Sequence, residues 1–459
     1  METLTITERL LRKYTSAVPR YTSYPAIPFW GETSEAQVAG WLGAEPATAD
    51  RSLSLYFHIP FCTKRCHYCG CFVVITPHKE QGNKYLQAVQ KEVEMVHGHL
   101  APERPVRQFH LGGGTPTFLD PEVIADLVAT TRERFDFEPD VEMSIEVDPR
   151  SVSAADLARL REVGFNRLSF GVQDFDPAVQ RAVNRVQPFE MVAALVEAAR
   201  AQGYLSVNFD LIYGLPAQTR ASFARTMEQV QALRPDRLAI YHYAHLPDNQ
   251  PHQRKIDPAL LPSTEEKSAI FLAARQALLE AGYRALGLDH FALPEDDLMR
   301  AYEAGTMRRN FMGYTTQAGV DLLAFGLSGI SEFSGGFWQN EKKLAQYYRA
   351  IEAGKLPVVR GLALTAEDRL RKGLIGDIFC KGGIDYGEVQ QRFGIDPPRH
   401  LAAEMAALAP MAADGLVVLN GTGMRVTERG QLFLRNIAAV FDAYLVGRTA
   451  GKVAFSRTF

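Results

Sequence analysis

Residues 56–72, Tyr-Phe-His-Ile-Pro-Phe-Cys-Thr-Lys-Arg-Cys-His-Tyr-Cys-Gly-Cys-Phe, contain four of the five cysteines of the chain. Cys62, Cys66 and Cys69 follow a Cys-x3-Cys-x2-Cys spacing after an apolar stretch, Leu53–Ile59, that predicts a strand. Thiolates are the usual ligands of iron–sulfur clusters, and three of them leave one iron of a [4Fe–4S] cube without a protein ligand. The spacing therefore favours a [4Fe–4S] cluster with one open iron.

Two other uses of clustered cysteines compete with this interpretation. Structural zinc usually takes two ligand pairs separated by a longer loop, whereas here four cysteines lie within ten residues. A disulfide framework suits a small secreted domain, and this chain has 459 residues. Zinc is the stronger of the two alternatives, and the cluster is favoured over both.

Length and composition limit the class of protein. A chain of 459 residues predicts one large domain with at least one smaller one. Its net charge near −3 and its lack of a basic block do not suggest a nucleic-acid partner, and no apolar run approaches membrane-spanning length. The first nine residues carry charges where a signal peptide needs an apolar core. Together with the clustered thiols, this predicts a reducing, cytoplasmic location.

Short apolar stretches alternate with helical patterns from Leu53 onward. Leu86, Val89, Val93 and Val96, for example, recur at three- and four-residue spacing, which predicts one buried helical face. Strand–helix alternation predicts an α/β fold with parallel strands and helices outside, either a barrel or an open sheet. The predicted strands are Leu53–Ile59, Val106–Leu111, Val141–Val147, Arg167–Gly171, Ser206–Ile212 and Arg237–Tyr243.

Helix boundaries are marked by capping residues and glycines. Expected helix starts are Asp120 with Pro121, Ser153 with Asp156, and Ser263 with Glu266, while Gly164 and Gly203 are expected to end helices. From about Thr365 the pattern changes to helices and one hairpin, whose turn is predicted at Asn420-Gly421. This segment resembles a winged helix, but without a basic recognition face we favour a helical cap over DNA binding. Cys380 lies in an apolar helical stretch and is expected to be a core residue.

The cysteine spacing, with Tyr68 before the third cysteine, resembles the radical S-adenosylmethionine (SAM) superfamily. The extension to Cys71 is similar to the family of oxygen-independent coproporphyrinogen III oxidases, in which Cys71 is not a cluster ligand. This resemblance implies a partial (β/α)6 barrel over residues 53–362, an N-terminal arm over 1–52 and a mainly helical, winged-helix-like C-terminal domain over 363–459. The Pro19–Pro25 part of the arm is expected to be a packing strap across the main domain, and a gating role beside the active site stays open.

Polar residues at the ends of predicted strands are candidates for one site, because ligands of parallel β/α folds bind at that edge. Gly112-Gly113-Gly114-Thr115-Pro116 follows the second strand and exposes backbone N–H groups. It resembles the SAM-contacting Gly-Gly-Thr-Pro motif of the superfamily. By resemblance, Tyr56, Gly112, Glu146 and Ile330 line a first SAM, and Tyr68, Gly114, Thr115, Gln173, Arg185, Asp210 and Ala244 line a second.

The stretch Arg308–Thr316 is a further match to the family, whose pattern Phe-Gln-Gly-Tyr-Thr-Thr is interrupted here by Met312. Arg308 and Arg309 are candidates for binding propionates, or else a solvated basic pair. His290 is a candidate substrate contact, or else a buried, hydrogen-bonded histidine. By resemblance, the residues expected at the reacting centre are Cys71, Glu146, Phe311, Met312 and Ile330.

The resemblance implies oxidative decarboxylation of two propionates of coproporphyrinogen III, giving protoporphyrinogen IX. In this reaction the reduced cluster cleaves SAM, and the 5′-deoxyadenosyl radical takes hydrogen from a propionate β-carbon before CO2 and one electron leave. The expected partners are the substrate and an unidentified low-potential electron donor, and the expected state is a monomer. Alternatives on the same scaffold are a haem-binding chaperone and a radical SAM methyltransferase acting on a tetrapyrrole.

Overall fold

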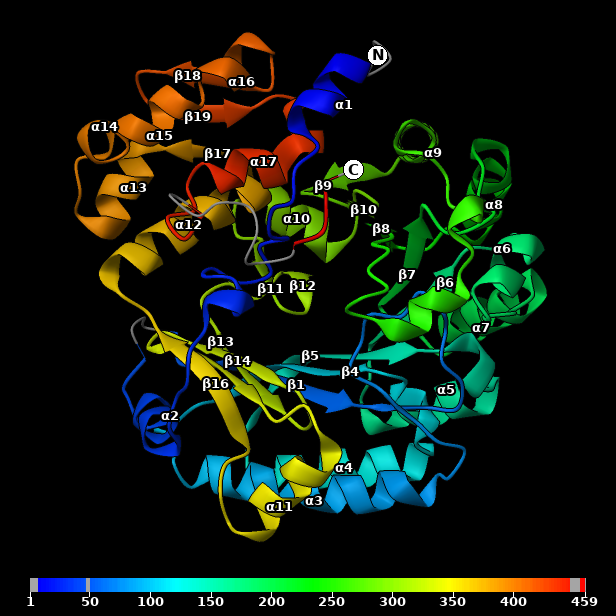
Figure 1. Ribbon diagram of the computed structural model, residues 1–459. Helices are drawn as coiled ribbons and strands as arrows, with labels where there is room; N and C mark the ends of the chain where they lie inside the picture. The colour runs from blue at the N-terminus through cyan, green and yellow to red at the C-terminus, as the bar shows by residue number, and fades with distance from the viewer. Residues whose placement is uncertain (1–6, 47–49, 446–454, 459) are drawn as a thin grey trace. The chain divides into compact units, whose positions relative to one another are not determined.

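A computed structural model of the chain describes residues 7–46, 50–445 and 455–458 (Figure 1). The chain divides into two compact units. Unit 1 comprises residues 1–30, 263–318 and 364–459, and unit 2 comprises residues 31–262 and 319–363. The sequence-based division at residues 52/53 and 362/363 stays a prediction.

Unit 2 contains a mainly parallel sheet with strands in the order β16-β15-β14-β13-β1-β4-β5-β6-β7-β8. Neighbours from β13 through β8 pair in parallel, and β14, β15 and β16 continue the sheet as an antiparallel meander. The strands are β1 (Leu53–Ile59), β4 (Val106–Gly113), β5 (Phe137–Val147), β6 (Arg167–Gln173), β7 (Ser206–Tyr213), β8 (Arg237–His242), β13 (Asp321–Phe325), β14 (Ile330–Phe333), β15 (Gly336–Asn340) and β16 (Val358–Ala363).

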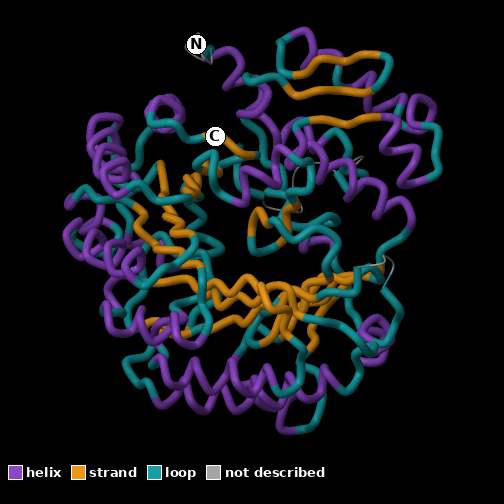
Figure 2. The backbone as a smooth tube through the Cα atoms, turned by 180° about the vertical axis from the view of Figure 1, so that it is seen from behind, coloured by secondary structure: helices purple, strands orange, loops and turns teal. Residues whose placement is uncertain are grey.

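Helices follow the parallel strands in the chain and cover the outer face of the sheet. Figure 1 shows α3 and α4 beneath β1 and β4, and the tube in Figure 2 shows the same helical layer from behind. The helices of unit 2 are α2 (Glu35–Leu42), α3 (Glu80–His97), α4 (Pro121–Arg132), α5 (Ala154–Val163), α6 (Pro177–Ala182), α7 (Phe189–Ala201), α8 (Arg220–Leu233) and α11 (Leu344–Glu352). This order confirms the predicted α/β class: the six predicted strands, β1 and β4 to β8, pair in parallel, and β13 adds a seventh parallel strand beside β1.

The helix boundaries largely follow the predicted capping residues. Ser153 and Asp156 form a reciprocal capping box at the start of α5, which ends at Gly164 in a left-handed conformation. Asp120 is the N-cap residue of α4, but its side chain makes no capping hydrogen bond. Its carboxylate pairs instead with the Lys79 ammonium group, so the proline at N1 and the backbone conformation start this helix.

Alternation along the strands separates an apolar face from a polar one. Leu55, Phe57 and Ile59 of β1 are fully buried, and the Phe57 ring packs 4.9 Å from that of Phe325 on the neighbouring strand. Tyr56 and His58 point to the opposite face, because successive side chains of a strand alternate. The other parallel strands repeat this arrangement, so their polar residues gather on one face of the sheet.

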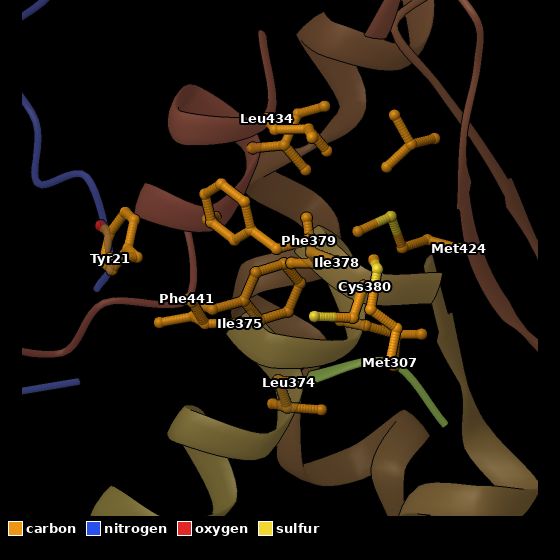
Figure 3. Close-up of a cluster of buried hydrophobic side chains, with 14 of the residues drawn as sticks. Tyr21, Met307, Leu374, Ile375, Ile378, Phe379, Cys380, Met424, Leu434 and Phe441 are labelled. Carbon is orange, nitrogen blue, oxygen red and sulfur yellow. The ribbon is translucent and has the colours of Figure 1, made fainter. Parts of the chain in front are cut away.

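Unit 1 is mainly helical and has its own apolar core, shown in Figure 3. Leu374, Ile378 and Phe379 of α12 lie in this core with Cys380, which is 2% exposed, as predicted. The hairpin β18–β19 turns at Asn420–Gly423, which confirms the predicted hairpin. The elements are α1 (Glu8–Tyr14), α9 (Thr264–Glu280), α10 (Asp297–Glu303), α12 (Ala366–Lys381), α13 (Tyr386–Phe393), α14 (Pro397–His400), α15 (Ala402–Ala407), α16 (Ala409–Ala413), α17 (Leu434–Ala439), β9 (Arg284–Leu286), β10 (His290–Ala292), β11 (Arg308–Asn310), β12 (Gly313–Thr315), β17 (Gly383–Asp385), β18 (Val417–Asn420) and β19 (Gly423–Val426).

The proline-rich arm packs against the C-terminal segments of unit 1. Tyr21 and Tyr24 are buried in its core, and the Tyr21 hydroxyl donates to Asp442 at 3.1 Å. The buried Arg435 guanidinium donates to the carbonyls of Val18 and Pro19. The arm therefore packs as a strap on unit 1, and not across the main β/α domain as expected. A gating role stays a prediction. Among the described residues, no helix combines the length and apolarity needed to cross a membrane.

Candidate active site

The cysteine loop, residues 62–72, leaves the sheet at the end of β1. Its ends are closed by parallel pairing of β2 (Phe61–Cys62) with β3 (Val74–Ile75). Among the described residues every cysteine is a free thiol, with Cys66 buried and Cys71 exposed. No three His, Cys, Asp or Glu side chains of the described part converge on one ion position. Cysteines that hold a cube each bind a different iron, so the cube does not require such convergence.

Two guanidinium groups approach the sulfur of Cys66. Arg185 Nη1 lies 3.7 Å and Arg150 Nη2 lies 3.9 Å from Cys66 Sγ. Both arginines also donate to the carboxylate of Asp148. The hydrogen bond from the Cys71 thiol, with help from nearby arginines, lowers the pKa of Cys69 to about 6, while burial raises that of Cys62 to about 11. This cationic setting suits thiolate ligands and an anionic cluster.

The glycine-rich turn after β4 allows close approach beside the sheet. A Cβ atom on Gly112 would lie 2.9 Å from both Tyr56 Cε2 and Glu146 Oε1, so no side chain fits at this position. Gly113 has a φ of +116°, and a Cβ there would meet the ring of His58 at 2.6 Å. The Gly113 N–H donates to Glu146 Oε2 at 2.9 Å, which orients the carboxylate at the end of β5. The turn therefore needs glycine for steric as well as conformational reasons.

The structure brings together three of the four residues predicted for the first SAM. The Tyr56 ring stacks on His110, with centroids 5.8 Å apart, and its hydroxyl lies 3.1 Å from His58 Nδ1. Gly112 and Glu146 adjoin this tyrosine, as the Gly112 contacts show. Ile330 begins β14, just after the turn that follows β13, and β13 pairs with β1. Its contact with this group stays a prediction.

A second group surrounds Arg185, which is 7% exposed. Its Nη1 donates to Asp148 Oδ2 at 3.0 Å and its Nη2 to the Gly171 carbonyl at 2.7 Å. A Cβ on Gly171 would lie within 3 Å of both Gln173 Nε2 and Arg185 Nη2, so these two side chains are neighbours. Asp210 pairs with Gly171 across β6 and β7. Three of the residues predicted for the second SAM, Gln173, Arg185 and Asp210, thus lie together.

The remaining predicted residues of this group lie around the cysteine loop. Thr115 Oγ1 is 3.2 Å from Cys62 Sγ, and the Gly114 N–H donates to the Ile59 carbonyl at 2.8 Å. Both Tyr68 and Ala244 accept hydrogen bonds at their carbonyls from one side chain, that of Gln253. These contacts connect the cysteine loop to the glycine turn and to Ala244, two residues after the end of β8.

One orphaned atom tests whether these residues fit SAM. Arg185 Nε is buried and has no hydrogen-bond partner. A buried guanidinium N–H left unpaired is costly, and a ligand carboxylate is the acceptor that suits it best. The free thiols, the cationic surroundings and the glycine turn likewise fit a cluster with SAM. The residues present therefore fit both cofactors.

Phe311 and Met312 lie in unit 1, at the turn between β11 and β12. The Phe311 ring packs 6.0 Å from Trp30, and the Met312 N–H donates to Asn310 Oδ1 at 2.9 Å. Because these residues belong to unit 1, their assignment to the reacting centre stays a prediction.

The two arginines next to this turn are half-buried and bound to backbone carbonyls, so neither of the two expectations for them is tested. Arg308 Nη1 donates to the Met307 carbonyl, and Arg309 Nη1 donates to the carbonyls of Arg20 and Tyr21. His290 is hydrogen-bonded to Asp289 at 2.8 Å with its side chain 14% exposed, as expected of a buried structural histidine. Propionate or substrate contacts by these residues stay predictions.

The sequence did not predict roles for three residues near the site. Asp148 bridges two arginines, and His252 and Gln253 hold the cysteine loop from outside. Asp148 could have been noticed because it follows a strand directly. His252 and Gln253 lie on a short 3-10 turn, η4 (Pro251–Lys255), where no periodicity indicates their direction.

Comparison with known families gives two matches. The model of the Radical SAM superfamily matches residues 56–230, and the model of the HemN C-terminal domain matches residues 364–433. The first match contains the cysteine loop and the strands from β1 to β7. The second match contains α12 and the three-stranded sheet of unit 1.

Comparison with individual proteins extends the similarity to almost the whole chain. The chain is 45% identical over 439 residues to the oxygen-independent coproporphyrinogen III oxidase of Salmonella typhimurium, covering 95% of each chain. It is 44% identical over 439 residues to the protein of the same name from Escherichia coli, again covering 95% of each chain. It also resembles the solved structure of E. coli coproporphyrinogen III oxidase (HemN), a radical SAM enzyme, with a TM-score of 0.91 and 42% identity over 97% of this chain and 100% of that one.

Proposed function

The chain belongs to the family of oxygen-independent coproporphyrinogen III oxidases, and we propose that it decarboxylates two propionates of coproporphyrinogen III oxidatively to vinyl groups. The product is protoporphyrinogen IX, so the reaction is a step of haem biosynthesis. The observation that carries this function is the similarity over 95% of both chains to named oxidases of this kind.

Cys62, Cys66 and Cys69 hold a [4Fe–4S] cluster in this proposal, and Cys71 does not. When bound, the cluster and SAM together supply the radical chemistry that removes hydrogen from the propionate. The chain's own contribution is to hold the three sulfurs on one loop beside Arg150 and Arg185. Such cations and N–H groups near the sulfurs are among the features that set a cluster's reduction potential.

Two SAM molecules bind at the end of the sheet in this proposal. Glu146, oriented by the Gly113 N–H, accepts from the first, and Tyr56 and Ile330 form apolar walls beside it. Arg185 receives the carboxylate of the second at its unpaired Nε. Gln173 and Asp210 offer polar contacts from the neighbouring strand ends, while Gly114 and Thr115 contribute the turn.

Substrate contacts are assigned to the turn between β11 and β12. Phe311 and Met312 are proposed to touch the substrate, and nearby arginines attract its carboxylates locally. Because the chain carries a net charge near −3, attraction of a tetra-anion has to come from such local cations. An electron donor of low potential, a monomeric state and a cytoplasmic location complete the proposal.

An anaerobic assay with reconstituted protein, a reductant, SAM and coproporphyrinogen III tests the function. Vinyl products with 5′-deoxyadenosine support it. Tight haem binding without turnover would favour the chaperone, and a methylated tetrapyrrole would favour the methyltransferase. Size-exclusion chromatography with light scattering checks the monomeric state.

A further inference from the structure

The cysteine loop is held from outside by the segment after β8, residues 244–256, which we name the brace. Within the brace, η4 places His252 and Gln253 against the loop. His252 Nε2 lies 2.7 Å from the Cys69 carbonyl, and its Nδ1 lies 3.4 Å from Arg65 Nη1. Since Arg65 can only donate, the Nε2 of His252 carries the proton and donates to Cys69.

Gln253 uses both ends of its amide and is only 2% exposed. Its Nε2 donates to the carbonyl of Tyr68 at 3.2 Å and to that of Ala244 at 3.3 Å. Its Oε1 accepts from the Leu246 N–H at 2.6 Å. One side chain thus ties the residue before the third cysteine to the first residues of the brace.

Apolar packing supports the same junction. The Tyr68 side chain packs against a buried cluster that includes Ile256 of the brace, Val183 and Tyr243. Gln253 therefore connects Tyr68 and Ala244, two residues proposed to line the second SAM. Gln253 itself is not among the residues proposed to contact SAM. Losing its amide would leave two carbonyls and one N–H without partners in a buried place.

We propose that Gln253 is a positioning residue that holds the Tyr68–Cys69 part of the cysteine loop in register with Ala244. This inference rests on the proposed second SAM site. Because Gln253 contacts both segments, binding of the second SAM affects the position of Cys69, and the position of Cys69 affects that binding. His252 supports the loop at Cys69 independently of the second SAM.

The test compares Gln253→Met, which keeps side-chain length without hydrogen bonds, with Gln253→Glu, which keeps the acceptor for Leu246 and, when protonated, one donor at most. Gln37→Met, at an exposed position of α2, is the matched control. Reconstituted protein is titrated with SAM by calorimetry, the reduced cluster is followed by electron paramagnetic resonance with and without SAM, and cluster loss to an iron chelator is timed.

We expect both Gln253 variants to take up the cluster, to bind the second SAM about tenfold more weakly and to leave the first site unchanged, as loss of buried hydrogen bonds implies. The SAM-induced change of the cluster spectrum should be altered, and KM for SAM should rise more than kcat falls. His252→Ala should speed cluster loss without changing SAM affinity.

Parental SAM affinity and spectra in Gln253→Glu would overturn the inference, because that variant has lost at least one of the two donor hydrogen bonds. If Gln253→Met fails to fold, the glutamate variant decides alone. A parent that binds two SAM molecules yet forms no vinyl product would overturn the proposed oxidase while leaving the Gln253 result valid. A parent that binds only one SAM would overturn the coupling itself.

Discussion

Arg185 and Asp148 form a buried ion pair in which Nη1 lies 3.0 Å from Oδ2, with side chains 8% and 10% exposed. Burial alone raises the pKa of Asp148, but attraction to Arg185 and hydrogen bonds from Arg150 hold it at about 2. The carboxylate therefore stays ionised and fixes one edge of the Arg185 guanidinium. The other edge, with its unpaired Nε, remains available for a ligand anion.

Arg185→Ala is expected to abolish measurable binding of the second SAM at ordinary concentrations. Losing one partner of a desolvated charge pair costs about 2–5 kcal/mol, which corresponds to roughly thirtyfold or more in affinity. Calorimetric titration of the reconstituted protein should fall from two sites to one. Arg159→Ala, which removes an exposed arginine paired with Glu122, should leave both sites intact. A parent protein that saturates at one SAM would contradict the prediction.

Ala substitution of Cys62, Cys66 or Cys69 is expected to remove the cluster, because two thiolates do not hold a cube securely. Cys71→Ala should keep the cluster, because Cys71 is not a cluster ligand in this proposal, and a lower decarboxylation rate in this variant is compatible with that result. Iron and sulfide analysis with visible absorption after anaerobic reconstitution measures the outcome. Cys380→Ala is the control, since this thiol lies in the core of unit 1. Stoichiometric zinc without iron in anaerobically purified protein would refute the assignment.

Met312→Gln is expected to speed decarboxylation. A thioether does not donate and accepts only weakly, whereas an amide does both. Loss of such a contact costs about 1–3 kcal/mol, enough to slow turnover by roughly ten- to a hundredfold. Single-turnover yields of 5′-deoxyadenosine and vinyl product compare the two forms, with SAM affinity unchanged. Equal rates would show that Met312 is a neutral packing choice.

Glu92 predicts a dependence of stability on pH. The carboxylate is 1% exposed and accepts from the Gly326 N–H, Asn340 and Tyr347. Burial raises its pKa from 4.5 to about 7. Because the folded state binds this proton more tightly, its contribution is fully present below pH 4.5 and is lost as pH rises through about 7. The loss amounts to about 3 kcal/mol.

The measurement for Glu92 is thermal unfolding at pH 5 and pH 8. Glu92→Gln should show a smaller fall in Tm between these values than the parent, because an amide does not titrate. Glu162→Gln, whose side chain is 67% exposed in the parent, should keep the parental fall. An unchanged pH dependence in Glu92→Gln would remove Glu92 as its source.

Local pattern was sufficient for the six predicted strands of unit 2, whereas β13 to β16 were not predicted. The predicted strand Leu53–Ile59 is β1 with the same bounds, and the starts of four of the other five predicted strands also agree. The exception is β5, which begins at Phe137 and not Val141. Its first residues include the charged Glu138 and Asp140, so they lack the apolar alternation that predicts a strand. Alternation and capping act within a few residues, so sequence alone contains them.

The polar strand ends were also predictable as a group. In a parallel sheet, the carboxyl ends of all strands share one edge, so Glu146, Gln173 and Asp210 had to lie on the same side. Which of these side chains meet was not predictable. Arg185 contacts Asp148 because the segment after α6 folds back toward the end of β5, and no local preference encodes that return.

The sequence by itself determined the cysteine spacing, the β/α order and the family resemblance, since spacing and periodicity are properties of neighbouring residues. Only the tertiary structure decided how the cysteine loop is held. Gln253 reaches Tyr68 across 185 positions of sequence, and His252 reaches Cys69 across 183. Such contacts form only when the strands have paired and the segment after β8 has closed over the loop, because buried carbonyls must find donors wherever the completed fold supplies them.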